Sequence, residues 1–305
     1  MMSDDDPFDC FGGDDVDVEE ETAVANTSVD EARRFEQRDP SNGILAFHAG
    51  TEQALLHYVK QEMLKETVSG AQENDKAAAV LRHVDDFSLR RHWMMHVGYG
   101  KGPIIEEFLT ECFQAHKALE QPLIVLEIGT YCGYSSILMA KTLRHLGCGF
   151  RILSVEVVAQ NAQVAKKMVE LAGLKEDVEI LLLDPEKDSL EALLRRNMES
   201  DNVIDFLFLD HDKTLYLSDL QQLEKCGFVK RGCFVAADNV IFAQIDDYRQ
   251  YVADLEKKKI VRTKLAMSFL EYSEPDHHGD EQKKNMMRDG VGESVIMHSC
   301  LHFGL

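Results

Sequence analysis

From residue 51 onward, apolar residues recur at the spacing of an amphipathic helix. Leu55, Leu56, Val59 and Met63 fall on one face when this segment is wound as an α-helix. Residues 77–82 indicate a second helix. Helices of this kind either cover a sheet or contact a partner, and covering a sheet is the more common arrangement.

After residue 121 the hydrophobic pattern becomes regular. Apolar runs recur there at intervals of 26–29 residues. They are LIVLEIG (123–129), RILSVE (151–156), VEILLLD (178–184), IDFLFLD (204–210) and CFVAAD (233–238). Each interval accommodates one strand, one helix and two short loops, so the spacing predicts repeated βα units.

The segments between these runs have the single apolar stripe of surface helices. The stripes are Ile137, Ala140 and Leu143; Ala162, Ala165, Met168 and Leu171; and Leu220, Leu223 and Cys226. Gly173 and Gly227 follow two of the stripes, where glycine commonly ends a helix.

The strand-like runs are apolar almost throughout, which is typical of strands buried on both faces in a parallel sheet. The last two runs, 266–272 and 292–301, enclose a polar insertion at 273–288 and predict an antiparallel hairpin at one edge. We therefore expect an α/β fold. It would be a Rossmann-like, doubly wound, mostly parallel seven-stranded sheet with an antiparallel terminal hairpin and extra N-terminal helices.

Composition excludes several classes of protein. With 305 residues, of which 45% are hydrophobic and 29% charged, the chain can bury a sizeable core, so it is neither wholly disordered nor fibrous. No apolar run is long enough to cross a bilayer. The start, MMSDDD, lacks the features of a secretory signal, and the 7 cysteines form no CxxC pair. We expect a cytoplasmic protein with reduced thiols and no membrane partner.

The net charge of −21 is unevenly distributed. Residues 1–39 contain 14 acidic residues and 3 Arg, a net −11, which leaves −10 for the other 266. This balance argues against a nucleic-acid partner, because phosphate binding requires a basic surface.

The chain therefore divides by composition into an acidic tail, predicted to be disordered, at 1–44 and a folded domain at 45–305. Within the domain, we expect N-terminal helices at 45–92 and an α/β core at 93–305. Phe8, Cys10 and Phe11 interrupt the tail. They are either a short docking motif for a protein partner or incidental residues in a solvated tail.

Chemistry-bearing residues stand at the ends of the predicted strands, where ligands bind in open α/β sheets. After the first strand, Glu127, Gly129 and Gly133 form the spacing E-x-G-x-x-x-G. This is similar to the first motif of class I S-adenosylmethionine (SAM)-dependent methyltransferases, although a tight turn alone would also use these glycines. The G-x-G-x-x-G and G-K-[ST] fingerprints are absent, which disfavours a nicotinamide-dependent dehydrogenase and an ATP-binding protein.

The remaining strand ends carry acids and one lysine. Glu156 can accept hydrogen bonds from the two hydroxyls of a ribose. Asp210, Asp238 and Asn239 offer oxygen ligands that suit Mg²⁺. Lys213 follows Asp210 by three residues, and a nearby dication disfavours the ammonium form of a lysine, which favours a general base. The alternative is that these acids only cap helices or pair with lysines.

Six blocks in order make the resemblance more specific. They are HWMMHVGYGKG (92–102), LEIGTYCGYS (126–135), FLDHDK (208–213), LEKCGFVKRG (223–232), ADNVI (237–241) and FLEY (269–272). Across roughly 200 residues, the chain resembles the catechol O-methyltransferase family.

The resemblance implies an Mg²⁺-dependent transfer of a methyl group from SAM to a hydroxyl of a catechol-like vicinal diol. Asp210, Asp238 and Asn239 match the family's metal ligands, and Lys213 matches its catalytic base. The implied substrate-binding positions are Trp93, Asp210, Lys213, Asn239 and Glu271. The implied SAM-binding positions are Met95, Val97, Glu127, Gly129, Tyr131, Ser135, Glu156 and His211.

Three positions depart from the family pattern. Asp212 replaces the aromatic residue that stacks near the adenine, and Pro185-Glu186 align with the adenine-contacting pair. The segment after Asn239 lacks the proline of the catechol pocket, and we expect Phe242 to rebuild that wall. The first two departures support an alternative function, a SAM-binding protein with lost or altered catalysis that acts as an interaction module. The retained metal and base residues argue against it.

Overall fold

The computed structural model describes residues 50–70, 75–119, 121–199, 201–241, 243, 245–268 and 294–301, and for β7 it describes only the backbone. The chain divides into two compact units, residues 1–57 and 58–305. Of the first unit only residues 50–57 are described, and they include the start of helix α3 (Thr51–Ser69). The predicted boundary at residue 44 lies outside the described residues and stays a prediction.

The described helices and strands alternate after residue 122. The helices before the sheet are α4 (Lys76–Arg90), α5 (Gly98–His116) and the 3₁₀ turn η2 (Lys117–Leu119). The strands are β1 (Leu123–Ile128), β2 (Phe150–Glu156), β3 (Val178–Leu182), β4 (Ile204–Leu209), β5 (Val229–Ala237), β6 (Val261–Ser268) and β7 (Ser294–Leu301). Between them lie α6 (Tyr134–His145), α7 (Ala159–Leu171), α8 (Leu190–Asn197), η3 (Lys213–Leu215), α9 (Tyr216–Lys225) and α10 (Asp246–Lys257).

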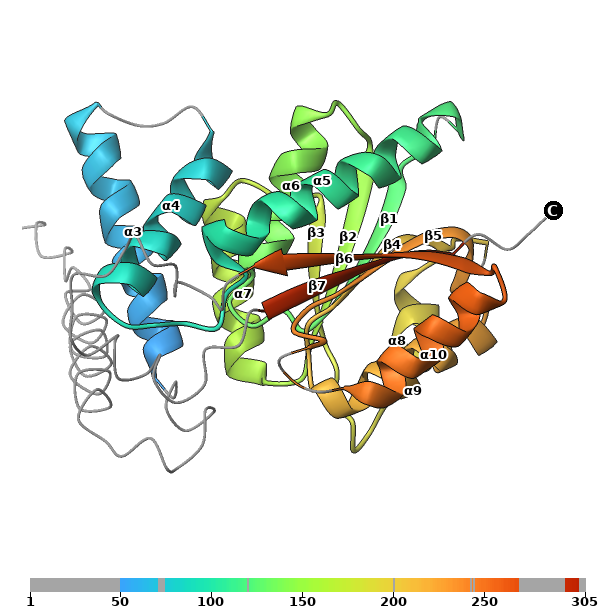
Figure 1. Ribbon diagram of the computed structural model, residues 1–305. Helices are drawn as coiled ribbons and strands as arrows, with labels where there is room; N and C mark the ends of the chain where they lie inside the picture. Colours follow the sequence, from blue (N-terminus) through green and yellow to red (C-terminus); the bar gives the residue numbers. More distant parts are fainter. Residues whose placement is uncertain are drawn as a thin grey trace, which may run out of the picture. The chain divides into compact units, whose positions relative to one another are not determined.

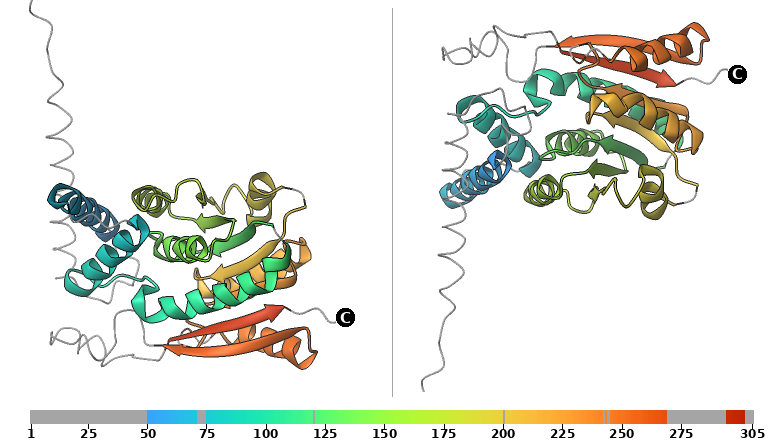
Figure 2. Two further views of the ribbon diagram at one scale, coloured as in Figure 1. Left: turned by 90° about the horizontal axis from the view of Figure 1, so that it is seen from above. Right: turned by 90° about the horizontal axis from the view of Figure 1, so that it is seen from below.

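The strands form one sheet in the order β3-β2-β1-β4-β5-β7-β6. The four pairings from β3 to β5 are parallel, whereas β7 runs antiparallel to both β5 and β6. Figures 1 and 2 show β6 and β7 side by side at one edge, with α10 next to β6. The predicted doubly wound fold with a terminal antiparallel hairpin is confirmed.

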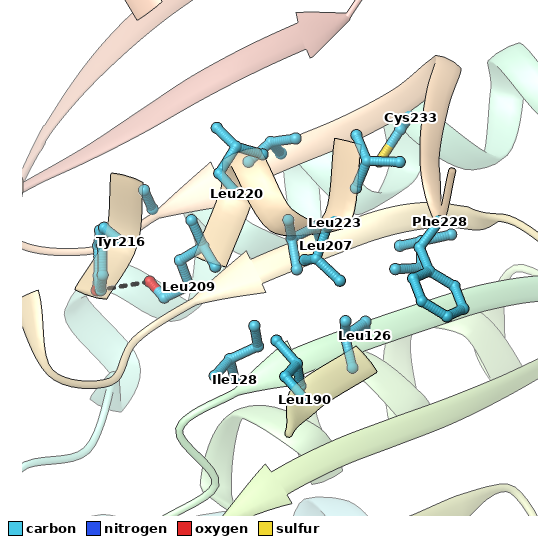
Figure 3. Packing of buried hydrophobic residues seen from close by; sticks show 14 of the residues in the cluster. Leu126, Ile128, Leu190, Leu207, Leu209, Tyr216, Leu220, Leu223, Phe228 and Cys233 are labelled. Atoms are coloured by element: carbon cyan, nitrogen blue, oxygen red, sulfur yellow. Dashed lines mark hydrogen bonds between the residues drawn. The ribbon is translucent and has the colours of Figure 1, made fainter. Parts of the chain in front are cut away.

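Helices cover both faces of the sheet because successive strand residues point to opposite sides. On β4, the ring of Phe206 meets Phe108 of α5, with 5.6 Å between ring centroids. Leu207 faces the other way, into a core shared with Leu220 and Leu223 of α9 (Figure 3). Residues from α8 and α10 join this second core, so the α8–α10 group lies opposite α5.

Polar side chains cap the first turns of two helices, α4 and α8. Asp75 accepts a hydrogen bond from the backbone N–H of Ala78 (3.1 Å) at the start of α4, and Ser189 accepts one from Ala192 (3.2 Å) at the start of α8. Helix α4 packs against α6 and α7, and Tyr134 donates to Asp85 (3.1 Å). As predicted, this helix covers another part of the fold, but that part is α6 and α7 and not the sheet itself.

Some predicted boundaries were wrong. The first hairpin strand begins at Val261, not at 266, and helix α4 extends to Arg90 beyond the predicted residue 82. The early part of β6 is missed because it is an edge strand with charged residues on one face, where Lys264 pairs with Glu107 (3.0 Å). An apolar run marks a strand only where both faces are buried.

The acidic tail at 1–44 and the 273–288 insertion lie outside the described residues. Of the helices that the structure describes, none combines the length and apolar character needed to cross a membrane.

Candidate active site

The loop after β1 is built around a buried carboxylate. Glu127 is fully buried, and its side chain accepts hydrogen bonds from the hydroxyls of Ser135, Ser136 and Ser154. Thr130 in turn bonds Ser154 at 2.5 Å. Burial raises the pKa of Glu127 to about 7, although the three hydroxyls act in the opposite direction. Glu127 thus fixes the glycine loop to the first turn of α6 and to β2.

The second strand ends in another tethered carboxylate. Glu156 accepts from the backbone N–H of Tyr131 (2.8 Å) in the glycine loop. It also accepts from the N–H groups of Val157 (3.0 Å) and Val158 (2.8 Å). Burial raises the pKa of Glu156, and these N–H donors lower it. The structure therefore places the predicted ribose-binding Glu156 next to the predicted SAM residue Tyr131.

The segment before α5 lies against the same loop. The Tyr131 hydroxyl is 3.8 Å from the sulfur of Met94, and the Tyr131 ring is 5.2 Å from that of His96. Of the positions predicted in this segment, Val97 is buried, and Trp93 and Met95 are half-buried. Tertiary packing thus brings the 92–97 segment to the glycine loop.

After β4, two oxygen atoms hold the side chain of Lys213, the predicted base. The ammonium of Lys213 lies 2.8 Å from Asp210 Oδ1 and donates to the Tyr216 hydroxyl at 2.7 Å. The Tyr216 hydroxyl donates to the backbone carbonyl of Leu209 at 2.7 Å (Figure 3). The pKa of Asp210 is raised to about 6, because burial and the nearby Asp238 carboxylate together outweigh the opposite effect of Lys213 and Lys101. Asp210, Lys213 and Asp238 therefore share one electrostatic environment.

At the end of β5, Asp238 and Asn239 meet a lysine from a distant helix. Lys101 of α5 is fully buried and forms an ion pair with Oδ2 of Asp238, which is itself buried. The same ammonium lies 3.4 Å from Asn239 Oδ1. Asn239 has a left-handed backbone (φ 58), and its N–H donates to Asp238 Oδ1 at 2.8 Å.

His211 and Asp212 follow Asp210 in the same loop. The His211 ring stacks on Tyr216 (4.9 Å between centroids), and its Nε2 lies 2.9 Å from Asp219. Asp212, the departure from the family pattern, accepts from the N–H (3.0 Å) and hydroxyl (2.7 Å) of Thr214. Asp212 therefore caps the η3 turn that carries Lys213, in place of a stacking aromatic residue.

The residues fit the predicted divalent cation by their chemistry. Asp210, Asp238 and Asn239 supply hard oxygen donors from two adjacent loops, which suits Mg²⁺. Among the residues that the structure describes, no group of three or more His, Cys, Asp and Glu could hold a metal ion. The predicted set contains two such residues, Asp210 and Asp238, and its third member, Asn239, is an amide.

Two residues of this region escaped the sequence reasoning. Lys101 lies inside the 92–102 block, but nothing in its neighbourhood indicates a partner so far along the chain. Tyr216 follows Lys213 by three residues, a spacing that would bring the two together on one turn. Glu271 and Phe242 lie outside the described residues. The roles assigned to the other residues stay predictions.

Comparisons with known proteins agree on one family. A family model described as O-methyltransferase matches residues 80–266. The chain is 34% identical over 229 residues to catechol O-methyltransferase of Bos taurus, covering 75% of each chain. It is 32% identical over 239 residues to catechol O-methyltransferase B of Danio rerio, covering 78% of each.

A solved structure shows the same fold. The O-methyltransferase TomG from Streptomyces achromogenes, in complex with SAM, aligns with a TM-score of 0.52 at 17% identity, over 76% of this chain and 91% of that one. On the extent of these matches, the chain belongs to the catechol O-methyltransferase family of SAM-dependent O-methyltransferases.

Proposed function

We propose that this O-methyltransferase acts with Mg²⁺ on one hydroxyl of a catechol-like vicinal diol, a small-molecule substrate. The observation that carries the proposal is the grouping of Lys213, Asp210 and Asp238 past the ends of β4 and β5. The names of the relatives in Bos taurus and Danio rerio support a catechol as the acceptor.

Different residues of the chain bind the cation and accept the proton. Asp210, Asp238 and Asn239 would hold the cation, which when bound polarises both oxygens of the diol and favours loss of a proton from one of them. Lys213, in its neutral amine form, receives that proton at Nζ and becomes an ammonium. The methyl group then moves from the sulfonium sulfur of SAM to the phenolate oxygen as the carbon–sulfur bond breaks and a carbon–oxygen bond forms.

The glycine loop after β1 positions the cofactor. Glu127 and Glu156 hold the loop from two sides through hydrogen bonds that need no bound cofactor. Holding two reactants in the right geometry can lower the activation barrier by roughly 7–11 kcal/mol in well-oriented systems.

The test is methyl transfer from labelled SAM to catechol, with excess Mg²⁺ and with EDTA. The matched acceptor is the 1,3-diol isomer, which has the same groups but cannot chelate through adjacent oxygens. We expect transfer to catechol alone and only with Mg²⁺. Transfer that persists in EDTA, or equal transfer to both diols, contradicts the proposal.

A calorimetric titration with SAM separates a changed acceptor from lost catalysis. SAM binding without transfer to any diol would favour the alternative of a methyltransferase-like interaction module.

A further inference from the structure

Lys101 is a buried cation for which the proposed reaction has no role. Its side chain is 0% exposed, and that of its partner Asp238 is 1% exposed. Lysine is rarely buried to this degree, because removing an ammonium from water is costly unless an opposite charge compensates it. Its position therefore depends on the carboxylate of Asp238 and on Asn239, two of the predicted metal donors.

We propose that Lys101 is a positioning residue that replaces the charge of the metal ion in the metal-free protein and weakens cation binding when the ion is present. The inference rests on the proposed function, because Asp238 and Asn239 are assigned as donors there. It goes beyond that function by adding a fixed competing cation to the site.

The charges of the site support both parts of this role. Two carboxylates, Asp210 and Asp238, lie close enough to repel each other, and Lys213 and Lys101 balance them. Whatever the protonation state of Lys213, the Lys101 ammonium cancels one of the two negative charges that a dication would meet, which lowers the affinity for the dication.

Lys213 and Lys101 differ in their exposure to solvent. Lys213 is 24% exposed and sits on a short 3₁₀ turn, so it can exchange a proton with an acceptor. Lys101 belongs to the regular helix α5, and its side chain is 0% exposed. Of the two ammonium groups, only Lys101 is placed to keep its charge beside the donors throughout turnover.

The experiment compares the full chain with Lys101→Gln and Lys101→Met. Gln keeps a hydrogen-bond donor without the charge, and Met keeps most of the volume with neither. Mg²⁺ affinity is measured by calorimetry, and melting temperature is measured in EDTA and in Mg²⁺. We expect both variants to melt about 10 °C lower in EDTA. We expect their Mg²⁺ dissociation constants to fall at least ~10-fold, so Mg²⁺ raises their melting temperature more than it does for the wild type.

Two further variants separate charge from general damage. Lys101→Arg keeps the positive charge and should bind Mg²⁺ within about 3-fold of the wild type. Asp205→Asn weakens the half-buried contact of Asp205 with His116 (3.5 Å) at the opposite end of β4. It should lower the melting temperature in EDTA without changing Mg²⁺ affinity.

Unchanged or weaker Mg²⁺ binding in Lys101→Gln overturns the inference while leaving the proposed function intact. Binding of Mg²⁺ by Lys101→Gln but not by the wild type would support Lys101 as the competing cation and contradict Mg²⁺ dependence of the natural enzyme. Failure of the wild type and of all four variants to bind Mg²⁺ contradicts both the inference and the proposed function.

Discussion

The backbone carbonyl of Asp210 occupies the space where a side chain on Gly129 would begin. A β-carbon built on Gly129 would lie 2.1 Å from the Asp210 carbonyl oxygen, and Gly129 has φ +102. The cofactor loop after β1 and the loop that carries the predicted base and metal donor after β4 are thus in direct backbone contact. Changing one loop must displace the other.

Gly129→Ala should therefore reduce SAM affinity at least ~100-fold and lower the melting temperature, because backbone cannot yield as a flexible side chain can. Calorimetry with SAM and thermal unfolding check both effects. Gly147→Ala is the matched control. Gly147 also has positive φ (+67), but nothing lies within 4 Å of its added β-carbon, so only the conformational strain of about 1 kcal/mol remains. Wild-type SAM affinity in Gly129→Ala would contradict the assignment of this loop.

Lys213→Met should lower turnover by roughly 10²–10⁴-fold, the usual contribution of a general base, while SAM affinity stays within about 3-fold. Initial rates and SAM titration measure the two effects. Lys187→Met provides the comparison, since Lys187 pairs with Asp184 at the same i,i+3 spacing on the surface. If Lys213→Met turned over as fast as Lys187→Met, Lys213 would not be the base.

Tyr216→Phe should reduce turnover about 10-fold, because it removes one of the two oxygens that position Nζ of Lys213. SAM affinity should be little changed. The matched variant Tyr251→Phe removes a hydroxyl bonded to Glu224 (2.5 Å) between α9 and α10. It should alter stability only. Equal rates in the two variants would mean that Tyr216 does not position the base.

Glu127 predicts a pH dependence of stability near neutrality. Its pKa in the folded protein is raised from 4.5 to about 7, so the folded state binds the proton more tightly than the unfolded state does. The stabilisation is fully present below pH 4.5 and is lost as the pH rises through 7. The full effect is on the order of 3 kcal/mol.

Glu127→Gln removes this titration. Its melting temperature should fall less than that of the wild type between pH 5 and 8, and the difference between the two curves isolates Glu127 from other groups, among them Asp210. Parallel curves for the two proteins would show that Glu127 does not titrate in this range.

The sequence by itself determined the layered α/β architecture, because a strand buried on both faces must be apolar throughout and a surface helix must have one apolar stripe. It also located Asp210, Lys213, Asp238 and Asn239, since the carboxyl ends of parallel strands meet at one edge of the sheet. At the start of β6 one face of the strand is exposed and carries charged residues, so the hydrophobic pattern did not predict the strand there.

Only the tertiary structure decided how those residues are held. Lys101 and Asp238 are 137 positions apart, and no local periodicity connects them. Similarly, Glu127 gains its partners from both α6 and β2. Pairing of a buried charge depends on which groups the packed chain brings within hydrogen-bond reach, and that is a property of the three-dimensional fold.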